Sequence, residues 1–432
     1  MQREKLIPGR LSVCSAVLLA LLSLALRSAF AEAGSRVEEP GVVKAADLLP
    51  PSMLRGDGYR VAEWVPTNGV MGVYTIVADA DVFHQYAGTY QVQSIELLRI
   101  REAEIPAIVQ LNDISKSKVF VQSLGASAIR PVKAAGNMIM NPLDTVNGLP
   151  SGVGRLFDRV GSGAGRLWGA ATDSSKSGGE RSEVVATKSA QVTRDALGYE
   201  QERRQLAKKL HVDPYTTNPI LSKQLDEIAW VSFSARLGVN TAISIAVPGS
   251  MIITGVRAAD DLVWDTPRGD LIVWVETHAE KLNIPKEQIN TFTHNLAIPL
   301  SLQVATIENL ERLGNVPERA DVISLMNAAL TEYQARFIGS SLRMLAEYHE
   351  RKAHITNIAA IGPLVARDQN GSLVLPAPAD YVSWTQRVAA FGTNPDFLAV
   401  QHRVLWITGK VSTLARKQFV ANGWNIQEGV AP

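Results

Sequence analysis

The pattern of hydrophobic and polar positions changes along the chain. Short β-rich runs at residues 59–65 and 70–77 are separated by Asn68-Gly69, a hairpin turn signal. Residues 94–111 then read as a helix interrupted by Pro106. From about residue 195 the pattern is mostly helical. We therefore expect an α+β chain with a small β-plus-α N-terminal unit, a Gly-rich amphipathic connector, and a larger mainly α-helical C-terminal domain with one β-hairpin.

Turn and capping residues set element boundaries in the second half. Asn218 can cap a helix that begins at Pro219, and Ser412 and Gly423 suit the two ends of the last helix. Asn370-Gly371 predicts the single hairpin at residues 364–375, and 404–407 could form a strand. The longest helix is expected at 317–349, with one apolar face typical of core packing: Met326, Leu330, Tyr333, Phe337, Met344 and Tyr348.

The first residues have the features of an export signal. A basic start precedes an uncharged, mostly apolar run at residues 11–26, and Ala29-Phe30-Ala31 fits a cleavage site before Glu32. We therefore expect an exported protein, periplasmic or secreted, cleaved near Ala31. The only cysteine, Cys14, lies in the apolar run, so the mature chain would have no disulfide, thiol nucleophile or thiolate metal site. The expected divisions are a signal peptide at 1–31, a flexible leader at 32–57, the β-plus-α unit at 58–132, the connector and linker at 133–194, and the mainly helical domain at 195–432.

Charge excludes one class of partner. The chain has 43 basic and 42 acidic residues. Cleavage would remove four of the basic residues and one acidic residue, which leaves 39 and 41. So balanced a chain has no general affinity for nucleic acid, and any basic surface must be local.

The connector contains one short phrase twice. Gly-Val-Gly-Arg-Leu-Phe at 152–157 returns eleven residues later as Gly-Ala-Gly-Arg-Leu-Trp at 163–168. Eleven residues are close to three helical turns, so the copies would stack on one side of a helix. One side would then be apolar and the opposite side basic. The predicted binding residues are Arg155, Leu156, Phe157, Arg159, Arg166, Leu167 and Trp168.

Glycines oppose that helix. Six glycines lie within 152–169, and each costs about 1 kcal/mol relative to Ala in a helix interior. We therefore expect the segment to order on a surface, which would be lipid, a partner protein or the rest of the chain. The alternative interpretation is a flexible Gly-rich linker that happens to carry a few apolar side chains.

A second apolar stretch occupies residues 237–256. It has no charge and is flanked by Arg236 and Arg257, and it is long enough to span a bilayer. Pro248-Gly249 near its middle divides it into two halves that are each too short to span. A buried core hairpin is therefore favoured over an element that inserts into a membrane.

The sequence carries no recognised enzyme motif. It has no Gly-x-Ser-x-Gly elbow and no complete phosphate loop. His349 and His354 would point about 140° apart on one straight helix, so they could share a metal only if the helix ended between them. They and Glu350 are the best catalytic candidates, and surface or core-edge histidines are the simpler interpretation. We predict no cofactor and no metal site, and the sequence identifies no small-molecule ligand.

Three phrases carry a resemblance to other proteins. They are the run from Asn147 to Phe157, the run Asp-Pro-Tyr-Thr-Thr-Asn-Pro at 213–219, and the ending from Thr408-Gly409 to Gly423-Trp424. With these phrases the chain resembles a group of exported bacterial proteins of unassigned function. The resemblance implies a bacterial, periplasmic setting, and no activity or site residue transfers with it.

The leading hypothesis is an exported, non-enzymatic protein whose Gly-rich repeat docks to an anionic lipid surface or an envelope protein. One alternative is an envelope hydrolase whose site is assembled from distant residues. The other is a secreted effector in which residues 237–256 enter a membrane.

Overall fold

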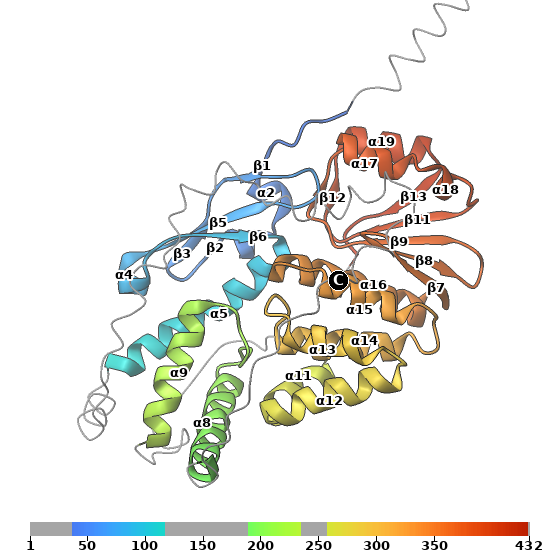
Figure 1. The fold of residues 1–432 in the computed structure, drawn as a ribbon. Helices are drawn as coiled ribbons and strands as arrows, with labels where there is room; N and C mark the ends of the chain where they lie inside the picture. The colour runs from blue at the N-terminus through green and yellow to red at the C-terminus, as the bar shows by residue number, and fades with distance from the viewer. Residues whose placement is uncertain (1–36, 117–188, 235–256, 431–432) are drawn as a thin grey trace, which may run out of the picture.

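The computed structural model describes residues 37–116, 189–234 and 257–430 (Figure 1). It confirms a mixed α+β chain, with small sheets at the N-terminus, a helical middle and a C-terminal sheet. The sheet-rich and helix-rich regions follow one another along the sequence.

The N-terminal unit is built on two small antiparallel sheets. The larger has the order β2 (Arg55–Gly56), β3 (Tyr59–Val61), β5 (Val73–Ala78) and β6 (Gly88–Gln93). The smaller pairs β1 (Val42–Lys44) with β4 (Trp64–Pro66). The remaining pieces are α2 (Ala45–Leu48), α3 (Pro51–Leu54), α4 (Ala80–Phe83) and the 3-10 turn η1 (His84–Tyr86).

Alternation along β5 explains how this unit makes its core. Tyr74, Ile76 and Ala78 are buried, whereas the residues between them are partly exposed, which is the two-residue period of a strand. Asn68 and Gly69 form the expected turn before β5, with the Asn68 N–H donating to Met71 O at 3.0 Å. The expected leader segment contributes β1, α2, α3 and β2 to this unit.

Three helices form what we call the helical arm: α5 (Ile95–Lys116), α8 (Ser189–Lys209) and α9 (Pro219–Ser234). In Figure 1 they extend away from the two sheets, toward the lower left. Pro106 lies inside α5 without ending it, unlike the expected interruption. The buried face of α9 consists of Leu221, Leu225, Ile228 and Ala229.

The helical middle runs from residue 257 to residue 351. Its members are α11 (Arg257–Asp265), α12 (Arg268–Lys281), α13 (Lys286–His294), α14 (Leu300–Arg312), α15 (Arg319–Asn327) and α16 (Glu332–Arg351). The expected helix at 317–349 is therefore two helices. Thr331 caps the second one by accepting from Gln334 N at 3.3 Å, and Gln334 Oε1 accepts from Leu330 N at 2.7 Å. Leu330, expected in the core, lies in the turn and is 76% exposed.

The C-terminal part corrects the expectation of a single hairpin. A five-stranded mixed sheet has the order β13-β11-β9-β8-β7. Its strands are β7 (Ile355–Ala360), β8 (Leu364–Asp368), β9 (Leu373–Ala377), β11 (Arg403–Ile407) and β13 (Trp424–Gln427). The predicted turn at Asn370-Gly371 does join β8 to β9. The other pairings include the parallel pairs β9–β11 and β11–β13, which need crossover helices and leave no turn signal in the sequence.

Helices cover both faces of this sheet (Figure 1). One face packs on α15 and α16, and the other carries α17 (Gln386–Gly392), α18 (Pro395–Leu398) and α19 (Thr413–Ala421). The short strands β10 (Tyr381–Val382) and β12 (Lys410–Val411) pair beside it. Along β9, Leu373 and Leu375 join the core cluster of the N-terminal unit and the arm, whereas Val374 joins that of the helical middle. The sheet therefore separates two cores.

Candidate functional site

The seven predicted binding residues lie outside the described residues. Arg155, Leu156, Phe157, Arg159, Arg166, Leu167 and Trp168 all fall within 117–188. The uncharged stretch at 237–256 also lies outside them. The structure does describe the elements that these segments join in sequence. Residues 117–188 connect α5 to α8, and residues 235–256 connect α9 to α11.

The middle of α8 lies beside the carboxyl end of α9. A Cβ placed on Gly198 would lie 2.5 Å from a ring carbon of Phe233, so the glycine permits this close approach. The hydroxyl of the next residue, Tyr199, donates to Asp226 Oδ1 at 2.6 Å, and Arg203 Nε, one turn further along α8, contacts the same oxygen at 2.6 Å. Burial and the bond to Asp226 raise the pKa of the Tyr199 hydroxyl.

An aromatic group lies at this end of the arm. Trp230 is 6.1 Å from Tyr199 and 6.1 Å from Phe233, measured between ring centroids. The Trp230 side chain is 48% exposed, which is unusual for so large an apolar group. We call Tyr199, Trp230 and Phe233 the arm-end aromatics. The three-residue spacing of Trp230 and Phe233 on one helix was the available sequence signal, but it blends into the apolar stripe of α9.

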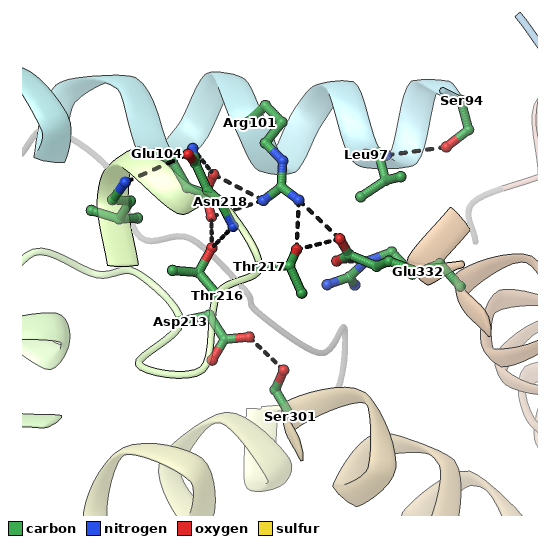
Figure 2. A network of polar contacts seen from close by, with 12 residues as sticks. Ser94, Leu97, Arg101, Glu104, Asp213, Thr216, Thr217, Asn218, Ser301 and Glu332 are labelled. Atoms are coloured by element: carbon green, nitrogen blue, oxygen red, sulfur yellow. Dashed lines mark hydrogen bonds and ion pairs between the residues drawn. The ribbon is translucent and has the colours of Figure 1, made fainter. Parts of the chain in front are cut away.

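The opposite end of the arm is fixed by a polar network, which we call the arm root (Figure 2). Arg101 of α5 donates to both oxygens of Glu104 at 3.1 and 3.0 Å and to Glu332 of α16 at 2.9 Å. The loop between α8 and α9 lies against these groups. Thr216 and Asn218 donate to Glu104, and Thr217 donates to Glu332.

Two arginines favour the charged form of Glu332 at the arm root. Burial alone would raise the pKa of Glu332, but Arg336 and Arg101 lower it to below its ordinary value. Arg336 Nε lies 2.7 Å from Glu332 Oε1. Glu104 is fully buried, and its carboxylate accepts from three side chains, so little capacity remains for a ligand. We interpret the arm root as a structural junction that sets the direction of the arm.

The loop carries one further buried acid. Asp213 accepts from Tyr215 N at 2.7 Å and from the hydroxyl of Ser301, the latter on α14. Burial raises the pKa of Asp213 to about 6. The phrase Asp-Pro-Tyr-Thr-Thr-Asn-Pro at 213–219 is thus explained by its contacts: it ties the arm to the helical middle.

A small cavity lies beside the arm root. Its volume is about 20 Å³, and Glu96, Arg336, Ser340 and Arg343 contribute to its polar lining. That volume suits about one water molecule. The Ser340 hydroxyl donates to Glu96 Oε2 at 2.6 Å. The cavity therefore has room for a structural water and none for an organic substrate.

The carboxyl ends of parallel strands, where open α/β sheets usually bind ligands, are covered by the N-terminal unit. Asp380 follows β9 and accepts from Gly72 N at 2.9 Å and from Ile95 N at 3.0 Å. The Tyr381 and Ser383 N–H groups donate to Val70 O and Gly69 O. We call this contact the sheet-edge junction. At this junction the N-terminal unit occupies the place where open α/β sheets usually bind a ligand.

His349 and His354 do come together, because α16 ends at Arg351, between them. His354 Nδ1 lies 3.1 Å from His349 Nε2. Glu350, the third catalytic candidate, is instead paired with Arg312, with two contacts of 2.8 Å. Among the described residues no group of three or more His, Cys, Asp or Glu side chains could hold a metal ion. The three candidates thus do not form one catalytic group.

Comparison with known proteins adds no relative. No family model matches the chain, and neither a curated protein nor a solved structure is significantly similar to it. Within residues 37–116, 189–234 and 257–430, every helix is too short or too polar to cross a bilayer.

Proposed function

We propose that this protein is an exported, non-enzymatic docking protein that attaches to an anionic membrane surface through residues 150–171. Leu156, Phe157, Leu167 and Trp168 would enter the interface. Arg155, Arg159 and Arg166 would contact lipid phosphates, each contributing about 1 kcal/mol near an anionic surface.

The observation that carries the proposal is the exposed Trp230 on the arm. The Gly-rich repeat is part of the connection between two arm helices, α5 and α8. Gly198 and Tyr199, in the middle of α8, pack against Phe233 and Trp230 of α9. Trp and Tyr are favoured at membrane interfaces, because each has an apolar body and a polar group. The proposal has Trp230 approach the same surface as the repeat.

Vesicle co-sedimentation tests the proposal. The mature chain (residues 32–432) is mixed with anionic or neutral vesicles at low and high salt. We expect binding to anionic vesicles that weakens at high salt, because arginine–phosphate attraction is screened. Binding should fall at least about tenfold in the double variant Phe157→Ala/Trp168→Ala, since each buried aromatic side chain contributes about 1.5–3 kcal/mol.

The chain offers a matched control. Trp64 on β4 is 53% exposed, similar to Trp230, but it belongs to the small sheet of the N-terminal unit. We expect Trp64→Ala to bind vesicles as the wild type does and Trp230→Ala to bind a few-fold more weakly. Unchanged binding by the double variant would refute the role of the repeat. No binding of the wild type under any condition would refute the membrane partner and direct the search to an envelope protein.

A further inference from the structure

The turn between α16 and β7 holds two histidine rings in direct contact. His349 lies in the last turn of α16, and His354 directly precedes β7. The two ring centroids are 4.7 Å apart, with the ring planes inclined by 68°. In addition, His349 Nδ1 lies 3.0 Å from Ile355 N, the first residue of β7.

The backbone contact fixes where the protons are. The Ile355 N–H can only donate, so His349 Nδ1 must be an unprotonated acceptor. A neutral His349 then carries its proton on Nε2, which faces His354 Nδ1 at 3.1 Å. His354 Nδ1 must therefore accept, and the proton of His354 is on Nε2. The two bonds, from Ile355 N to His349 and from His349 to His354, define a single arrangement of protons.

No state with one added proton preserves both bonds. A proton on His354 Nδ1 turns that nitrogen into a donor that faces the donor Nε2–H of His349. A shift of the His349 proton to Nδ1 would repair this contact, but it would place a donor against the Ile355 N–H. Each added proton thus costs one bond, because both unprotonated nitrogens are already acceptors.

From this geometry we propose that His349 and His354 form a pH-operated latch on the α16–β7 turn. The latch is closed when both rings are neutral. Uptake of one proton from solvent opens it and releases the Ile355 N–H, because the bond between a charged and a neutral ring is the stronger of the two. Because β7 is an edge strand of the five-stranded sheet, opening frees the start of that edge. The inference is independent of membrane docking.

The surrounding charges do not offset the effect. Burial and the neighbouring His354 lower the pKa of His349, and Glu350 raises it only in part. Glu350 is itself neutralised by Arg312 of α14. The other charged groups near the turn are Glu347, Arg351 and Lys352 from the α16 end, Glu318, whose carboxylate approaches Ile358 N, and Arg367 of β8, whose carbonyl accepts from Thr356.

The same geometry is unfavourable for a metal. A histidine that binds a metal through one nitrogen usually donates the N–H of its other nitrogen to an acceptor. His349 does the opposite, because its Nδ1 accepts from Ile355. A metal on Nε2 would force a proton onto Nδ1 and break that bond.

Hydrogen–deuterium exchange tests the latch. Peptides that include Ile355 are followed by mass spectrometry in the mature chain from pH 8 to pH 5, with correction for intrinsic exchange rates. We expect protection at Ile355 to fall about fivefold below pH 6.5, as the loss of one hydrogen bond implies. Peptides from the central strand β9 should keep their protection, which separates local opening from unfolding.

Two asparagine variants identify the mechanism, since an Asn side-chain oxygen replaces Nδ1 as an acceptor that does not titrate in this range. His354→Asn should keep a pH step at Ile355, because His349 Nδ1 still takes up a proton and then loses the Ile355 bond. His349→Asn should keep the Ile355 bond at all pH values. His294→Asn, on α13, is the matched control and should retain the step. Absence of a pH step in the wild type, or an unchanged step in His349→Asn, would overturn the proposal.

Discussion

Two junctions that use buried carboxylates join the N-terminal unit and α5 to the rest of the chain, and they are built in opposite ways. At the arm root, Glu104 and Glu332 share the guanidinium of Arg101. At the sheet-edge junction, Asp380 accepts from two backbone N–H groups. Attraction between full charges holds the first, and neutral dipoles hold the second. From these two arrangements we expect opposite responses to acid.

The direction of each response to acid follows from the pKa shifts of Glu332 and Asp380. The pKa of Glu332 lies below its ordinary 4.5, so its ionised form favours folding, and this stability is lost as the pH falls through the folded value. Burial raises the pKa of Asp380 from 3.8 to about 6, although the Gly72 and Ile95 N–H groups oppose the shift. Between pH 3.8 and about 6, Asp380 is protonated in the folded state and ionised in the unfolded state. Lowering the pH through this range therefore increases the contribution of Asp380 to the free energy of unfolding.

The largest effect is expected from breaking the arm root. Arg101→Met would leave Glu104, which is fully buried, without the cation that neutralises it. We expect the free energy of unfolding to fall by about 3–5 kcal/mol, as when one partner of a buried pair is removed. Urea denaturation of the mature chain measures this. Lys223→Met, which breaks the exposed pair with Glu227, is the control and should change stability by less than about 1 kcal/mol.

A smaller effect is expected at the sheet-edge junction. Asp380→Asn keeps one acceptor oxygen but turns an amide group toward a backbone N–H that then has no partner. We expect a loss of about 1–3 kcal/mol, measured in the same way at pH 7. Asp396→Asn, at an exposed position on α18, should be nearly neutral. A loss at Asp380 as large as that at Arg101 would contradict the distinction between the two junctions.

The opposite signs can be tested directly by varying pH. From pH 6 to pH 4, the stability advantage of the wild type over Asp380→Asn should grow, by an amount on the order of 1 kcal/mol per unit of pKa shift. The advantage of the wild type over Glu332→Gln should shrink as the pH falls below 4.5. Denaturation midpoints at several pH values, with wild type and variant side by side, give both slopes. Parallel slopes for the two variants would show that the junctions do not differ in this way.

The smallest effect is expected at the arm end. Gly198→Ala places a methyl group 2.5 Å from the Phe233 ring, so we expect it to destabilise by up to about 1 kcal/mol despite the higher helix propensity of Ala. Gly269 of α12 has nothing within 4 Å. Gly269→Ala should therefore stabilise, by about 0.4–1 kcal/mol. Thermal melting of the two variants decides the point, and a gain in both would mean that Phe233 moves aside freely.

Local signals in the sequence predicted many element boundaries correctly. Asn218 does cap α9, accepting from Ile220 N at 3.1 Å, and Ser412 caps α19 by accepting from Ala415 N at 3.0 Å. The hairpin at Asn370-Gly371 is confirmed, and Gly371 has the positive φ of 78° that such a turn requires. These predictions succeeded because caps and turns depend on residues only a few positions apart.

Other features needed the long-range contacts. The break between α15 and α16 had a local signal, Thr331 with Gln334, but the apolar spacing hid it by running through Leu330. The parallel pairing of β9, β11 and β13 had no local signal, because its partners are separated by helices. For the candidate site, the repeat at 152–168 stays a prediction from sequence, whereas the exposure of Trp230 became visible only in the folded arm.

Whether a feature could be predicted from the sequence depends on how many positions separate the residues that interact. Helix caps and hairpin turns are properties of short windows, so the residues in those windows were sufficient to predict them. The export signal is also read from a short window, and it stays a prediction. The arm root joins Glu104 to Asn218, 114 positions away, and the sheet-edge junction joins Gly72 to Asp380, 308 positions away. The ionisation of such groups depends on burial and on partners that only the folded chain brings together, and the same holds for His349 and His354, which meet because α16 ends between them.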